Sequence, residues 1–216
     1  SAASDVYKRQ CKTRRGTELR SVLWTIVLAK RAAELTVRAT PKPYEPLPKS
    51  ARQIRDAILQ AHRWVSLDNL LVYCWQHGMP VIPLQVKPRS SKKVDGLIVR
   101  VGERPVIVLA CGYRYSARLL FIVAHELGHW VSGHLSDEPI WAEDSITREG
   151  ESLEEAEANW FAVELLTGKP DKAYWAPRFL TPSQLAQSAQ EASERDKVDP
   201  GAVSYTHLTL PTIDSV

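Results

Sequence analysis

The stretch HELGH, residues 125–129, carries the residue types with the clearest capacity for chemistry in this chain. His125 and His129 are four positions apart, which places both imidazoles on one face of a helix, one turn apart. Two histidines at this spacing can hold one zinc ion, and Glu126 can take a proton from a water on that ion. Two hydrogen-bonded histidines in a core helix would show the same pattern, so the interpretation needs support from other residues.

Residues 117–132 are predicted to form the helix that carries this stretch. Apolar residues cover most of its circumference, and the polar residues share one stripe: Arg118, His125, Glu126, His129 and Ser132. A helix this apolar is buried, so the stripe must face groups that satisfy it, and we favour a metal ion. For Glu126 the alternative role is to pair with Arg118 or to cap the helix.

A catalytic zinc site needs a third protein ligand and an open position. His134 is one candidate, but it follows His125 by nine residues, which puts it on the opposite side of a continued helix. Two other roles are open to it. It is either exposed beyond the end of the helix or a hydrogen-bond donor to the transition state.

The better candidate lies on a helix predicted from Ser152 to Thr167. Glu155 falls on the apolar arc of that helix, and a buried carboxylate needs a metal or another cation. Asn159, one turn further on, can supply an oxygen that orients a metal-bound imidazole. The alternative is a capping box, in which Glu155 bonds the start of the helix at Ser152. We favour Glu155 as the third ligand.

Short β-branched segments upstream predict a small antiparallel sheet packed on the histidine helix. They span residues 81–86, 96–101 and 105–110, and a hairpin turn joins the last two. A strand such as 105–110 could bind an extended peptide by its edge. Further helices are predicted over residues 17–38, 50–64 and 67–77.

The composition suits a globular protein of the cytoplasm. The net charge is only +3, and no apolar run reaches the roughly 20 residues that cross a bilayer. Three scattered cysteines show no metal or redox spacing, which favours a reducing compartment. Over residues 11–63 basic residues outnumber acidic ones roughly three to one. Direct contact with nucleic acid is one reading of this region, and a solvated helical face or an interdomain contact is the simpler one.

Two motifs together resemble the ImmA/IrrE metallopeptidase family, a gluzincin-type group of bacteria and phages. They are RLLFIVAHELGHW, at residues 118–130, and EEAEANWFAVELL, at residues 154–166. The resemblance implies a compact α+β peptidase fold, zinc held by His125, His129 and Glu155, and Glu126 as the general base. It also implies a protein substrate, such as a helix-turn-helix repressor or an antitoxin, whose cleavage regulates transcription.

The expected reaction is therefore zinc-assisted hydrolysis of a peptide bond. Tyr113, Tyr115 and His134 are the candidates for a hydrogen-bond donor to its transition state, and ordinary packing is the alternative role of the two tyrosines. Two rival functions fit the same residues. One is a metal-binding regulatory module that binds DNA or protein without cleaving it, and the other is a zinc hydrolase of small molecules. Glu126 favours an enzyme, because a purely structural metal site does not need it.

Both ends of the chain look foreign to this fold. Residues 1–10 and 203–211 read as one oligonucleotide translated from its two strands, and they resemble a sequencing adapter. We expect the following organisation: adapter-like segments at residues 1–10 and 202–216, an N-terminal helix with a proline-rich linker at 11–48, the metallopeptidase domain at 49–180, and a tail at 181–201. No helix-turn-helix is recognisable between residues 11 and 40, so we expect any DNA-binding domain to lie upstream.

Overall fold

The computed structural model describes residues 23–84, 95–110, 115–135, 140–142, 153–172, 174 and 181–203. The predicted adapter-like residues 1–10, as well as Tyr113 and Ser152, lie outside these ranges. Among the described helices, none combines the length and the apolar character that a membrane span requires.

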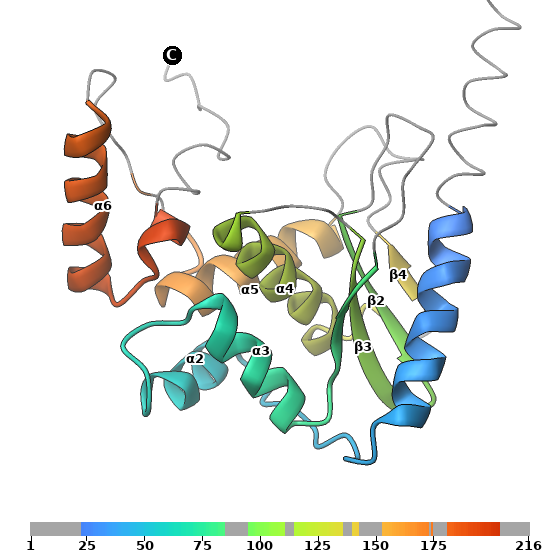
Figure 1. Cartoon of the computed structure of the whole chain (residues 1–216). Coiled ribbons are helices and arrows are strands. Elements are labelled where there is room, and N and C mark those ends of the chain that lie inside the picture. Colours follow the sequence, from blue (N-terminus) through green and yellow to red (C-terminus); the bar gives the residue numbers. More distant parts are fainter. Residues whose placement is uncertain are drawn as a thin grey trace, which may run out of the picture.

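A four-stranded sheet in the order β1-β3-β2-β4 lies between the N-terminal helix and α4 (Figure 1). The strands are β1 (Val81–Pro83), β2 (Gly96–Val101), β3 (Arg104–Leu109) and β4 (Ile140–Ala142). β2 and β3 form the predicted antiparallel hairpin, and β4 adds antiparallel to β2. β1, however, runs parallel to β3. The α+β class is confirmed, but the sheet is mixed, because β3 lies between β1 and β2 and runs parallel to one and antiparallel to the other.

Helices cover both faces of this sheet (Figure 1). Residues 23–39 form a helix on one face. On the other face α4 (Ser116–Val131) packs against β2, β3 and α5 (Leu153–Thr167). The remaining helices are α2 (Ala51–Leu59), α3 (Leu67–Gln76) and α6 (Pro182–Asp196). In this layered arrangement the two helices that carry the predicted metal ligands lie side by side.

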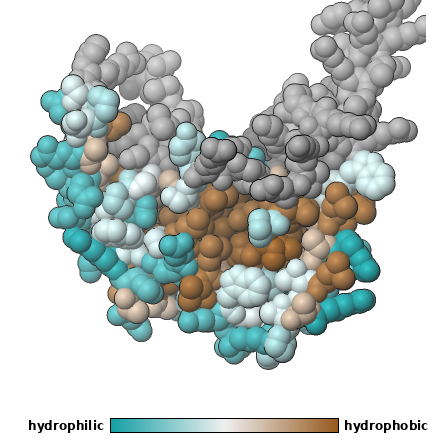
Figure 2. Space-filling view, viewed as in Figure 1, coloured by the Kyte–Doolittle hydropathy of each residue, from teal (hydrophilic) through white to brown (hydrophobic). Residues whose placement is uncertain are grey.

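The strands alternate their side chains between the two helical layers, as the period of two requires. Ile98 and Ile107 belong to the core that α4 shares. Their neighbours in the strands pack with Ala29 and Ala33 of the N-terminal helix; they are Leu97, Val99, Val106 and Val108. The face shown in Figure 2 has apolar surface gathered in its middle, in the region that α4 occupies in Figure 1. Leu119 and Phe121 of α4 are only partly buried by the described residues.

Helix ends follow local capping only in part. Ser66 caps α3 through a reciprocal capping box with Asn69. Ser50 precedes α2 without a side-chain cap, and α4 begins after Tyr115 rather than with Ser116 as its cap. α2 ends at Leu59, earlier than predicted, because residues 60–64 form turns and bends and Val65 then forms a β-bridge with Val198.

Arg55 of α2 ties together the carboxyl ends of two other helices. Its Nη1 donates to the backbone carbonyls of Leu165 and Leu166 at 3.1 and 2.6 Å. Its Nη2 donates to the carbonyls of Asp196 and Lys197 at 3.1 and 2.7 Å. The guanidinium is buried, and its positive charge suits the partial negative charge of helix ends. Arg55 therefore attaches α6, which lies within the predicted tail, to the main core.

The proline-rich residues 40–48 are attached to the turn before β1. The amide of Glu45 donates to the carbonyl of His77 at 2.9 Å. Arg104 donates from Nε to the Gly78 carbonyl at 2.6 Å and from Nη1 to the Thr40 carbonyl at 2.9 Å. These bonds give the linker a fixed course along the domain.

Candidate metal centre

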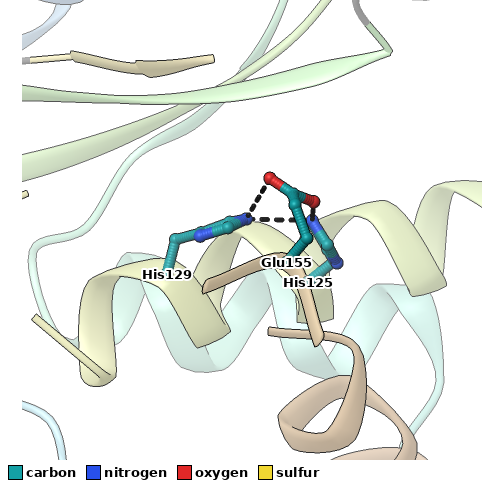
Figure 3. A group of neighbouring side chains, drawn as sticks. All are labelled: His125, His129 and Glu155. Atoms are coloured by element: carbon teal, nitrogen blue, oxygen red, sulfur yellow. Dashed lines mark hydrogen bonds and ion pairs between the residues drawn. The ribbon is translucent and has the colours of Figure 1, made fainter. Parts of the chain in front are cut away.

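The structure brings His125, His129 and Glu155 together. The two histidines project from α4, and Glu155 reaches them from α5 (Figure 3). The Nε2 atoms of the histidines are 3.0 Å apart. The Glu155 carboxylate lies 3.2 Å from Nε2 of His125 and 3.5 Å from Nε2 of His129. All three possible ligand atoms lie within 4.8 Å of one another, as binding to a single ion requires.

Small residues allow the two helices to approach closely enough for this contact. A Cβ atom added to Gly128 would lie 3.0 Å from Cα and 3.1 Å from the carbonyl oxygen of Ala158. The backbones of α4 and α5 therefore meet at Gly128 and Ala158. Gly128 lies between the two histidines on α4, and Ala158 follows Glu155 by about one turn on α5. Sequence reasoning missed this pair, although a glycine inside an apolar helix is a signal of close packing.

The three side chains are largely withdrawn from solvent, and their charges are coupled. Burial lowers the pKa of His125, but the bond to Glu155 and the charge of Glu126 outweigh it and raise the pKa above its usual value. Burial, followed by the charge of His125, lowers the pKa of His129 to about 3. At neutral pH His129 is therefore a neutral imidazole, the form that binds a metal.

The residues present fit a metal ion. Nδ1 of His125 lies 3.0 Å from Oδ1 of Asn159. Because this amide oxygen accepts, the proton of a neutral His125 lies on Nδ1 and the lone pair of Nε2 faces the cluster. Two imidazole nitrogens and one carboxylate oxygen then point at a common centre with no donor among them. This is a common ligand set for catalytic zinc.

Glu126 is buried, with 4% of its surface exposed, and lies next to His125 on α4. It faces the start of β2, where a Cβ atom on Gly96 would come within 2.7 Å of Oε1 of Glu126. The absence of a side chain at Gly96 leaves the space that this carboxylate occupies. Arg118, the alternative partner considered for Glu126, forms an ion pair with Asp95 at 2.6 Å.

Residues 74–205 match the family model of the IrrE N-terminal-like domain, Peptidase_M78. This stretch includes β1–β4, α4, α5, α6 and every residue of the centre. The chain belongs to the ImmA/IrrE family of metallopeptidases. No curated protein matches it.

The other candidates of this ImmA/IrrE metallopeptidase occupy different places. His134 is not among the three converging groups: its Nδ1 lies 2.9 Å from Nδ1 of His129, on the side of that ring away from Glu155. Its Nε2 lies 2.9 Å from Oε2 of Glu157. Tyr115 precedes α4 and is 76% exposed. Tyr113 and the proposed cap at Ser152 lie outside the described residues.

Proposed function

We propose that this protein is a zinc-dependent endopeptidase that cleaves a protein regulator. The observation that carries the proposal is the convergence of His125, His129 and Glu155 beside a buried Glu126. Membership of a metallopeptidase family makes peptide hydrolysis the natural use of this arrangement. A purely structural metal site would have no use for the second carboxylate.

Zinc is the proposed metal, because two imidazoles and one carboxylate are its common catalytic ligand set. When bound, it supplies a Lewis acid that polarises a carbonyl and makes water easier to deprotonate. His125, His129 and Glu155 hold the ion, and Asn159 keeps the ring of His125 oriented toward it.

Glu126 performs the proton transfers. Its carboxylate accepts the proton of the attacking water and donates it to the nitrogen that leaves when the peptide bond breaks. Its position next to His125 on the same helix keeps it close to the ligands, and the missing side chain of Gly96 leaves room for its carboxylate there. Correct placement of such a group contributes roughly 100- to 10,000-fold to the rate.

An extended substrate would pair with the outer strand β4. The edge of residues 105–110, which the sequence favours, is not free, because β1 and β2 flank β3 on both sides. β4 pairs with β2 along one edge, and it follows α4 in the chain. The apolar surface over α4 in Figure 2 would suit apolar side chains of the substrate.

The choice of a regulator as substrate rests on the family resemblance. Members of this family often accompany or contain a helix-turn-helix domain, and some cleave a repressor. A repressor or an antitoxin encoded beside this chain is accordingly the first substrate to examine. The cysteine pattern favours a cytoplasmic site of action, and the resemblance points to a bacterial or phage-encoded protein.

The test compares the wild type with Glu126→Gln, both loaded with zinc. We expect the wild type to cleave a helix-turn-helix protein that is encoded by an adjacent gene. The variant should cleave it at least about 100-fold more slowly, with unchanged zinc content. Fragment masses and metal analysis provide the two measurements. Equal rates would remove Glu126 from the mechanism. Absence of any protein cleavage by the wild type, with hydrolysis of small amides, would favour the small-molecule hydrolase.

A further inference from the structure

His134 lies behind His129, and the end of α4 explains its position. Gly133 adopts a positive φ of 79°. The amide of Gly133 donates to the Trp130 carbonyl at 3.1 Å, and the amide of His134 donates to the His129 carbonyl at 3.1 Å. This pair of bonds is a Schellman motif, which reverses the chain at the helix end. It returns His134 onto His129, with the two ring centroids 5.1 Å apart.

The contacts of His134 form a chain from a ligand to the surface. Nδ1 of His129 meets Nδ1 of His134 at 2.9 Å, and Nε2 of His134 meets Oε2 of Glu157 at 2.9 Å. The His134 side chain is only 7% exposed, whereas that of Glu157 is 55% exposed. The inner link is therefore protected from water, and the outer link is not.

The carboxylate of Glu157 sets the donor and the acceptor of both hydrogen bonds in the series His129–His134–Glu157. An ionised carboxylate can only accept hydrogen bonds, so Nε2 of His134 carries a proton and donates a hydrogen bond to Glu157. In neutral His134, Nδ1 then has a lone pair and accepts the Nδ1 proton of His129. That leaves Nε2 of His129 unprotonated, and this is the atom that faces Glu155 and His125. Opposite bond directions would place a proton where the metal must bind.

We propose that His134 is a positioning residue, backed by Glu157, which fixes the tautomer and the orientation of His129 and so strengthens metal binding. It serves the second histidine as Asn159 serves the first. The proposal rests on the metal-binding function of the site, but not on the identity of the substrate. It also assigns His134 a role other than ligand or donor to the transition state.

Zinc affinity, measured by competition with a chelating dye, tests the proposal on the whole chain. Loss of such an outer partner lowers metal affinity roughly 10- to 100-fold. We expect this loss in His134→Ala, partial recovery in His134→Gln, whose carbonyl can still accept, and a smaller loss in Glu157→Leu because that link is exposed. Glu157→Gln retains an acceptor and should stay near the wild type. His62→Ala, which removes an exposed histidine far along the chain, is the matched control.

Two spectra separate positioning from other roles. In the metal-free wild type, ¹⁵N resonances of the histidine rings should show His129 protonated at Nδ1, and His134→Ala should lose this preference. The visible spectrum of the cobalt-loaded protein should keep the same coordination number in His134→Ala, because no ligand is removed.

The outcomes are distinct. Wild-type protein that binds no zinc would overturn the proposed function itself. Wild-type protein that binds zinc, together with unchanged affinity in His134→Ala, would overturn only the role of His134. A changed coordination number in the cobalt spectrum would make His134 a ligand instead, and a metal-free wild type with His129 protonated at Nε2 would also refute the proposal. If His134→Ala fails to fold, the tautomer of His129 in the wild type and the zinc affinity of Glu157→Leu still test the role of His134.

Discussion

Two buried clusters in this molecule gather electron-rich atoms, and they differ in the source of the cation. Around Arg55, four carbonyl oxygens at the ends of α5 and α6 face a guanidinium that the chain supplies. Around the metal centre, two imidazole nitrogens and a carboxylate face one another. The first cluster is complete once the chain has folded, whereas the second needs an ion from solution. We therefore expect the first to govern stability and the second to govern activity.

The largest effect on stability should come from Arg55→Met, which keeps the packing of the stem but removes the charge. Each hydrogen bond to a charged group contributes roughly 1.5–3 kcal/mol, but the cost of burying the guanidinium offsets part of the sum over the four bonds. We therefore expect the free energy of unfolding to fall by about 4 kcal/mol. Urea denaturation of the metal-free protein measures the loss. Arg52→Met, at an exposed position of the same helix, should change it little. Similar losses in both variants would contradict the role given to the carbonyl contacts.

Glu155→Ala should lower zinc affinity strongly and the stability of the metal-free protein only slightly. Zinc sites contribute roughly 10–16 kcal/mol from about four ligands, so one ligand corresponds to about 3 kcal/mol, or a loss of more than 100-fold in zinc affinity. The metal-free protein should unfold at nearly the wild-type urea concentration. Glu164→Ala, on the same helix but outside the cluster, should keep the wild-type affinity. Tight zinc binding by Glu155→Ala would show that another residue completes the site.

Gly128→Ala tests whether the close approach of α4 and α5 serves the centre. The added methyl group meets the backbone of Ala158, so the helices must separate slightly and Glu155 moves with α5. We expect zinc affinity to fall about tenfold, a loss like that of an outer partner of a ligand. The better helix propensity of alanine, about 1 kcal/mol, should offset much of the strain in the metal-free protein. Unchanged zinc affinity would separate the helix contact from the site.

The smallest effect concerns protons. Because the pKa of His125 is raised and that of His129 is lowered to about 3, only His125 carries a proton to be displaced just below neutral pH. Zinc affinity should therefore fall about tenfold per pH unit below the pKa of His125, with one proton released per ion. Calorimetry in buffers of different ionisation enthalpy counts these protons. Release of two protons at pH 6 would contradict the coupling described here.

The metal centre was predictable because its signals are local. His125 and His129 are one helical turn apart, and Glu155 is a carboxylate on an otherwise apolar arc. The roles of Glu126 and Asn159 stay predictions, although the structure places Asn159 against His125. The position of His134 was not predictable from helical spacing, because Gly133 ends the helix and reverses the chain.

The Arg55 cluster illustrates what the sequence leaves open. Its acceptors are backbone carbonyls more than 100 positions away, and nothing in the residue types of α5 or α6 announces them. α6 itself packs through small residues such as Ala189 and Ala192, which give a weak apolar pattern. β1 has three residues, too few to indicate the direction of its pairing. The proposed domain boundaries stay predictions.

The bonds that Glu45 and Arg104 make along the proline-rich stretch have a mechanical consequence. They restrict the conformations that residues 40–48 can adopt. The helix at residues 23–39 is therefore held both by this linker and by its own packing on the sheet. Any partner that binds this helix would thus hold the sheet and the metal centre in a defined orientation.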